Sequence, residues 1–93
     1  MSEFDDLPPH DIEAEEAVLG AAMVEPDQIP GIAAVVRPAH FFREKHGWIL
    51  EAIETLYQRD GRTGVNAVTI AHELAAKDRL ETIGGQTFLH DVI

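Results

Sequence analysis

The sequence predicts an all-α fold, a small orthogonal bundle of about five to six short helices around a central helix over residues 43–59. Apolar side chains recur every three or four residues along most of the chain, and no stretch of four or more residues alternates as a half-buried strand would. Cysteine is absent from the 93 residues, so a packed core must stabilise the fold without disulfides. We expect a flexible acidic tail over residues 1–8 and one helical domain over residues 9–93.

The first expected helix follows two prolines and ends at Val24. Asp11 is placed to cap it, and three glutamates in the first turn favour its positive end. Gly20 is expected on the face opposite the apolar arc. Glu15 lies inside that arc, so we expect backbone amides or a cation from another element to meet its carboxylate. The arc itself contains Ile12, Ala14, Val18, Leu19, Ala22 and Met23.

A turn region and a short second helix are expected next. Pro30 suits the first position of a helix that continues over residues 31–36. Pro38 ends this helix because it disfavours the helical conformation at Arg37. Phe41 and Phe42 then lie in a connector, and both aromatic rings are expected to plug the core.

The clearest helical periodicity lies between Arg43 and Arg59, and Asp60-Gly61 forms the stop. Burying each aliphatic side chain of this stripe contributes roughly 1.5–3 kcal/mol, more than a surface ion pair does. We interpret His46 as a hydrogen-bonded core histidine. Trp48 lies off the stripe and is either a core margin or an interface anchor. The stripe comprises His46, Ile49, Leu50, Ile53, Leu56 and Tyr57.

The last third of the chain predicts two further helical segments. Asn66 is expected to cap a helix from Ala67 to Lys77 that buries an apolar stripe. After an apolar turn, Gly84-Gly85 breaks the chain and residues 86–93 begin another helix. The expected buried residues are Val68, Ala71 and Leu74, with Ile70 as a further candidate, then Leu80, Ile83, Phe88, Leu89, Val92 and Ile93.

The net charge of −10 is unevenly distributed. Residues 1–36 carry nine acidic side chains and no Lys or Arg. Five of the seven basic residues fall between residues 37 and 62, interleaved with four acids. Because phosphate contacts need concentrated positive charge, direct nucleic-acid binding by this domain is disfavoured.

The motifs of several enzyme classes are missing from the sequence. It has no Gly-x-x-x-x-Gly-Lys-Ser/Thr, so ATPase activity is excluded for these residues, and the five histidines show no metal-ligand spacing. The first-turn glutamates are better explained by the helix dipole than by acid–base catalysis. We expect no catalytic residue, cofactor or metal. No basic signal region or membrane-length apolar run occurs, which predicts a soluble cytoplasmic protein.

Five islands of sequence together resemble a known family. They occur in the same order and with similar spacing as in the N-terminal domain of DnaB-type replicative DNA helicases, over residues 7–93. Glu16, His40, Phe42, Phe88 and Asn66 depart from the family pattern, where Gln, an acid, Tyr, Tyr and Asp are usual. The islands are LPPHDIEAEEAVLG from residue 7, RPAHFF from residue 37, HGWI from residue 46, VNAVT from residue 65 and GGQTFL from residue 84.

The resemblance implies a helical domain in the N-terminal collar of a ring hexamer. Its implied partners are the C-terminal domain of a DnaG-type primase and the other helicase subunits. In that family the nucleotide site, the DNA-binding loops and a pairing helical hairpin follow the part matched here, so the isolated chain is expected to be a monomer. Candidate interaction residues are Trp48, Phe88, Leu89, Val92 and Ile93.

A second reading of the resemblance stays open. A free-standing helical adaptor or regulator could keep the collar fold and bind helicase or primase in trans. A gene that continues past Ile93 into a nucleotide site would favour the first reading.

Overall fold

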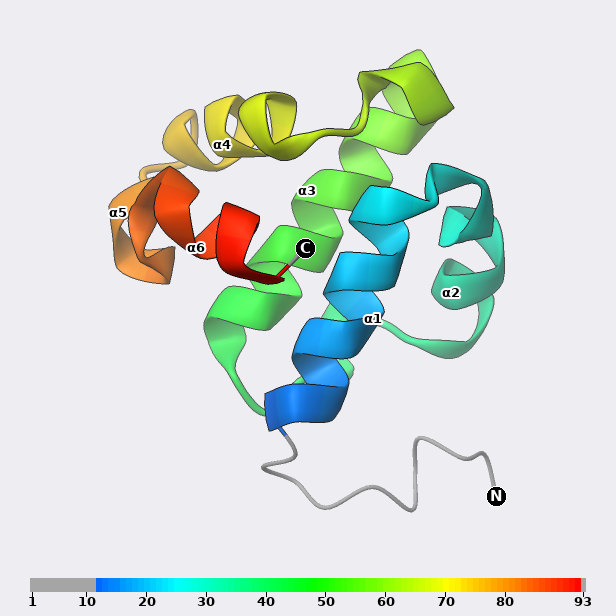
Figure 1. Cartoon of the computed structure of the whole chain (residues 1–93), viewed down its shortest axis with the longest axis horizontal. Coiled ribbons are helices and arrows are strands. Elements are labelled where there is room, and N and C mark those ends of the chain that lie inside the picture. The colour runs from blue at the N-terminus through cyan, green and yellow to red at the C-terminus, as the bar shows by residue number, and fades with distance from the viewer. Residues whose placement is uncertain (1–11, 93) are drawn as a thin grey trace.

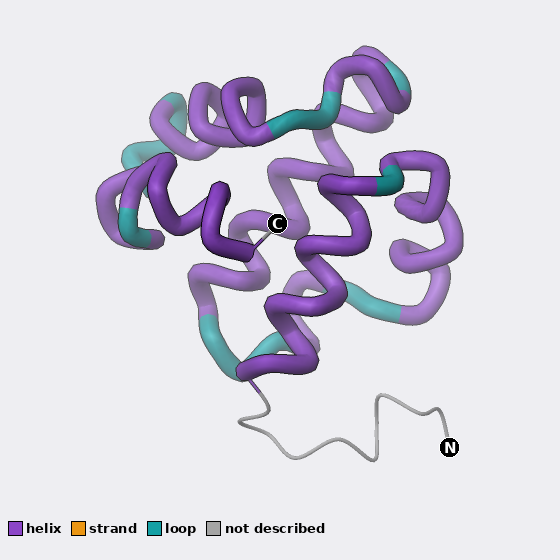
Figure 2. The backbone as a smooth tube through the Cα atoms, in the orientation of Figure 1, coloured by secondary structure: helices purple, strands orange, loops and turns teal. Residues whose placement is uncertain are grey.

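The computed structural model describes residues 12–92, and the expected acidic tail, the Asp11 cap and the position of Ile93 lie outside these residues. Within residues 12–92 every regular element is helical, which confirms the all-α prediction (Figure 2). The elements are α1 (Ile12–Val24), η2 (Pro26–Gln28), α2 (Ile29–Val35), η3 (Pro38–His40), α3 (Glu44–Asp60), η4 (Arg62–Gly64), α4 (Ala67–Ala75), α5 (Leu80–Ile83) and α6 (Gly85–Val92).

Helix α3 is the centre of the bundle, as predicted, and its bounds differ from the expected range by one residue at each end. Figure 1 shows α1 alongside α3, and α4 runs back along α3 from the C-terminal end of α3. Helix α6 packs against α4 and α1. Ile49, Leu50 and Ile53 are fully buried. Gly61 ends the helix with φ +74°, a conformation that costs glycine little.

Helix α2 begins one residue before Pro30, which corrects the expected first position. Ile29 occupies that position and is buried, while Pro30 is the second helical residue. Proline is tolerated at either place because the first amides of a helix have no partner inside it. The helix ends at Val35, and Val36 is extended.

The connector after η3 buries only one of the two aromatic rings expected to plug the core. Phe41 packs against the core, whereas Phe42 is 60% exposed. Phe41 has extended backbone geometry. Since successive side chains of an extended chain point to opposite sides, two neighbouring rings cannot both face inward.

Helix α4 has the predicted cap but a different buried face. Asn66 Oδ1 accepts a hydrogen bond from the Thr69 amide at 2.9 Å, and Thr69 Oγ1 accepts one from the Asn66 amide at 3.1 Å. Val68 was expected inside and is 51% exposed, while Ile70 is fully buried. The buried stripe starts at Ala67 instead, which leaves Val68 beside it. The helix ends at Ala75 rather than Lys77.

The C-terminal elements fold back onto the core. Ile83 is buried and Leu80 packs at the margin of the core, as expected. Gly84, with φ +108°, ends α5, and α6 starts at the next residue. Gly20, predicted on the outer face of α1, is buried instead, because the Val92 carbonyl of α6 lies directly over it.

Candidate interaction surface

The predicted interaction residues of α6 lie on and in the core of this chain. Leu89 is fully buried, whereas Phe88 and Val92 are partly buried and pack against the core. The apolar face of α6 therefore packs mainly against the core of its own domain. Phe88 and Val92 keep the accessible part of that face.

Trp48 lies at the margin of the core on α3. Its ring is partly buried against the core cluster, and the guanidinium carbon of Arg79 lies 4.8 Å from the ring centroid. A cation over an indole face is attracted by the ring quadrupole. Both sequence interpretations, core margin and interface anchor, stay compatible with this position.

Glu15 of α1 receives the partners that its place in the apolar arc requires. Its carboxylate accepts hydrogen bonds from the backbone amides of Phe42 and Arg43, at 2.5 and 3.4 Å. Its Oε1 also lies 2.6 Å from Nδ1 of His46. The carboxylate thus joins α1 to the start of α3, where the helix dipole favours negative charge.

His46 is the fully buried histidine expected on α3. Because a carboxylate only accepts, Nδ1 is the donor to Glu15. Nε2 has no hydrogen-bond partner within residues 12–92, and Glu16 Oε2 lies 3.7 Å from it. The ring stacks on Phe88 at 5.9 Å between centroids and meets the edge of Phe41 at 6.2 Å. His46 of α3 therefore contacts α1, the connector after η3 and α6.

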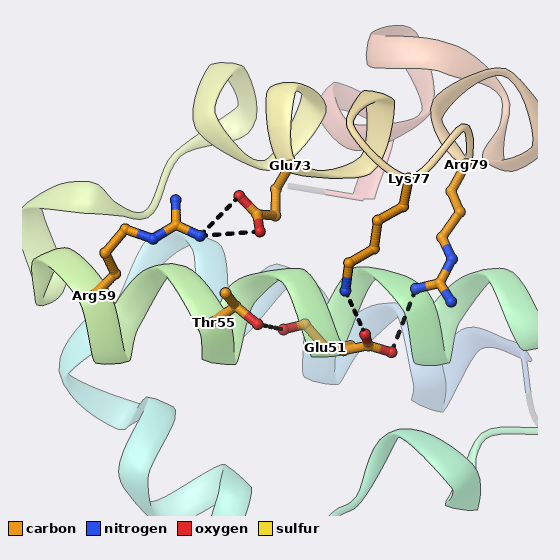
Figure 3. Close-up of polar contacts among 6 residues, drawn as sticks. All are labelled: Glu51, Thr55, Arg59, Glu73, Lys77 and Arg79. Carbon is orange, nitrogen blue, oxygen red and sulfur yellow. Dashed lines mark hydrogen bonds and ion pairs between the residues drawn. The ribbon is translucent and has the colours of Figure 1, made fainter.

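A row of ion pairs joins α3 to α4 and to the turn after it (Figure 3). Glu51 accepts from Lys77 Nζ at 2.8 Å and from Arg79 at 3.4 Å. Arg59 donates to both carboxylate oxygens of Glu73, at 3.1 and 3.3 Å. The Lys77 hydrogen bond, supported by the charges of Lys77 and Arg79, lowers the pKa of Glu51 against a smaller effect of burial.

Glu54 has the opposite electrostatic environment. Burial raises its pKa, and the nearby Glu51 charge adds to this effect while Arg37 opposes it. One carboxylate oxygen is buried without a hydrogen-bond partner in residues 12–92. Neither the Glu51 pairs nor this orphaned oxygen could be predicted from the sequence. The partners of Glu51 lie 26 and 28 positions away along the chain, and the burial of the Glu54 oxygen depends on how the helices pack.

Metal-binding and membrane-spanning features are absent from the part of the chain that the structure describes. In it, no group of three or more His, Asp or Glu side chains is arranged to hold a metal ion. No helix among residues 12–92 has both the length and the apolar character needed to cross a membrane.

Comparison with known proteins identifies close relatives of the whole chain. The chain is 41% identical over 88 residues to the "Replicative DNA helicase DnaC" of Bacillus subtilis (strain 168), covering 95% of this chain and 19% of that protein. It is 38% identical over 86 residues to the "Replicative DNA helicase DnaB" of Geobacillus stearothermophilus, covering 92% and 18%. The chain thus spans about a fifth of the length of these curated relatives.

The fold comparison agrees. The crystal structure of the N-terminal domain of DnaB helicase from Mycobacterium tuberculosis matches with a TM-score of 0.85 and 38% identity, covering 94% of this chain and 61% of that one. The family model for the DnaB-like helicase N terminal domain matches residues 7–93. The chain therefore belongs to the DnaB-like helicase N-terminal domain family.

Proposed function

We propose that this chain is a non-catalytic collar domain of a hexameric replicative DNA helicase, acting in DNA replication. The observation that carries the proposal is the match of the family model to residues 7–93. Relatives named as replicative DNA helicases support it, because an alignment over about a fifth of their length fits a single domain of a larger helicase. The domain acts by contact, in ring assembly and in docking of a DnaG-type primase in the cytoplasm.

Trp48, Phe88 and Val92 are proposed as direct contact residues. Each packs at the margin of the core with part of its apolar surface accessible. Leu89 has a supporting role, because it is fully buried and anchors α6. Ile93 is kept as a contact residue by its place next to Val92 in the sequence.

Calorimetry with the C-terminal domain of a DnaG-type primase tests the docking proposal. We expect weak, micromolar or weaker binding to the 93-residue chain, because a partial interface loses affinity steeply. Trp48→Ala should weaken it at least about fivefold, whereas Val68→Ala, an exposed position on α4, should leave it unchanged. Nanomolar affinity would place the complete docking surface in this chain, and no heat at about 1 mM would contradict docking.

A chimera tests ring assembly. Residues 7–93 of this chain replace the matching segment of the B. subtilis helicase, and sedimentation reports the oligomeric state. We expect a hexamer that hydrolyses ATP, while the 93-residue chain alone shows no turnover above a blank. A chimera that folds with native helix content but stays monomeric would refute the collar role.

A further inference from the structure

A groove of about 430 Å³ lies between η3 and the first two turns of α3. Its lining combines three aromatic rings and a proline ring with two carboxylates. Those residues are Pro38, Phe41, Phe42, Trp48, Glu44 and Glu51. The groove is on the side of α3 that faces η3, and α6 contributes nothing to its lining.

The floor of the groove is closely packed, and one end of it is tied by hydrogen bonds. A Cβ added at Gly47 would lie 2.5 Å from the Pro38 carbonyl oxygen, so the missing side chain lets η3 lie directly on α3. At the end of the groove, the Glu15 carboxylate accepts hydrogen bonds from the backbone amides of Phe42 and Arg43. A ligand would therefore meet walls that are already in place, which lowers the entropic cost of binding.

The lining chemistry selects a proline-containing segment with neighbouring basic residues. Polyproline II segments dock on grooves lined by aromatic rings, and their low conformational entropy favours binding. Residues 44 to 51 rise roughly 10 Å along the helix, the length of about three polyproline II residues. Trp48 adds an indole N–H donor, and the Arg79 guanidinium packs against its ring within the chain.

The charge at the rim of the groove also favours a ligand with basic residues. Glu44 is exposed and forms no ion pair with any of residues 12–92, so its carboxylate can attract a basic side chain of a ligand. Glu51, at the opposite end, is already paired with Lys77 and Arg79. The chain carries a net charge of −10, which disfavours acidic ligands and a second copy of itself. We propose that this groove binds an extended, proline-containing segment of a partner protein that carries Arg or Lys beside the prolines. The proposal does not depend on the collar role.

Trp48 makes the test direct because it is the sole tryptophan of the chain. The intact chain is titrated with a blocked synthetic peptide, Arg-Ala-Leu-Pro-Pro-Leu-Pro-Arg, and its fluorescence is followed. We expect a saturable blue shift with a Kd in the range of about 10–500 μM, typical of a small interface. Two control peptides replace every Pro by Ala or both Arg by Glu, and each should bind at least tenfold more weakly.

Paired variants place the peptide on the groove. Glu44→Lys should weaken binding at least tenfold, whereas Glu81→Lys, the same charge change at an exposed position on α5, should weaken it less than threefold. Ala39→Arg, at an exposed lining position, should block the groove sterically with the fold intact by circular dichroism.

Three outcomes would overturn the proposal. The first is that about 1 mM peptide causes no fluorescence change. The second is that the alanine peptide binds as tightly as the proline peptide, which would indicate a helical or unspecific ligand. The third is that Glu44→Lys and Glu81→Lys lose the same affinity, which would indicate an effect of bulk charge.

Discussion

Glu15 lies on α1, but its carboxylate is stabilised by donors from other parts of the chain. A carboxylate in an apolar arc is costly unless donors compensate it, and here two backbone amides and His46 do so. The side chain is only 12% exposed, so water screens these contacts weakly. The packing of α1 on the start of α3 therefore depends on a charged group rather than on apolar contact alone.

Glu15→Gln keeps one acceptor oxygen and removes the charge. We expect it to lower the free energy of unfolding by about 1–3 kcal/mol, the usual cost of weakening charged hydrogen bonds in a buried site. Urea denaturation measures this loss. Glu13→Gln is the matched control in the same helical turn, exposed to solvent, and it should change stability by less than about 0.5 kcal/mol. Equal losses for the two variants would show that Glu15 acts only on the α1 dipole.

Glu54 gives a pH-dependent prediction. Because burial raises its pKa above the ordinary value of 4.5, the folded state holds this proton more tightly than the unfolded chain does. The stabilisation is complete below the unfolded pKa and is lost as the pH rises through the folded pKa. Glu54→Gln should therefore raise stability at neutral pH by about 1 kcal/mol or less, with no gain near pH 4. Thermal unfolding at both pH values checks this, and a gain of equal size at both would contradict it.

At the scale of single residues, the sequence predicted that Glu15 has a polar partner but did not identify that partner. The arc position of Glu15 predicts that a partner exists, but the partners lie 27 to 31 positions away. The same separation hides the Lys77 pair of Glu51, 26 positions apart. Local periodicity carries no information on such contacts, because they depend on how whole helices cross.

Elements were predicted better than contacts, because their signals are local. Pro38 at the start of η3, the Asn66 cap and Gly61 each act within one turn of chain, so the predicted helix boundaries fall within about two residues of the observed ones. The errors at Val68 and Phe42 have one cause. Several apolar residues compete for one inward face, and only the packing of neighbouring elements decides which of them is buried.

Gly20 and Gly31 separate helix propensity from helix packing. A Cβ at Gly20 would meet the Val92 carbonyl, whereas a Cβ at Gly31 would meet nothing within 4 Å. Gly20→Ala should therefore destabilise the fold by about 1–3 kcal/mol through overpacking of α6. Gly31→Ala should stabilise it by about 0.5–1 kcal/mol, because alanine suits a helix interior better.

Denaturation of both variants measures the two effects. The α6 contact would be excluded as the cause if Gly20→Ala were as stabilising as Gly31→Ala. An amide-exchange change confined to α6 in Gly20→Ala would support it.

For the whole molecule, charge sets what the chain can bind. A net charge of −10, with no Lys or Arg in residues 1–36, leaves few positions that could release counterions from a nucleic acid. The remaining cations are partly engaged, since Arg59, Lys77 and Arg79 each pair with a glutamate. We expect no appreciable affinity for single- or double-stranded DNA at physiological salt. Fluorescence anisotropy checks this, and submicromolar binding at about 150 mM salt would refute the charge argument.

The assembly state of the 93-residue chain depends on how much apolar surface remains exposed after the domain has folded. Leu89 is fully buried, and Phe88 and Val92 pack on the core of their own domain. Among residues 12–92, the exposed large apolar side chains are Val24, Val35, Phe42 and Val68, and they lie on different segments of the chain.

A stable interface needs roughly 800 Å² from each partner, and scattered valines supply little of it. Repulsion between two copies of charge −10 adds to this, although salt screens it within about 8 Å. We therefore expect a monomer at micromolar concentration, which sedimentation velocity measures. A stable dimer or hexamer at about 10 μM would mean that the globular part carries the assembly contacts itself, and that repulsion between its copies is too weak to oppose them.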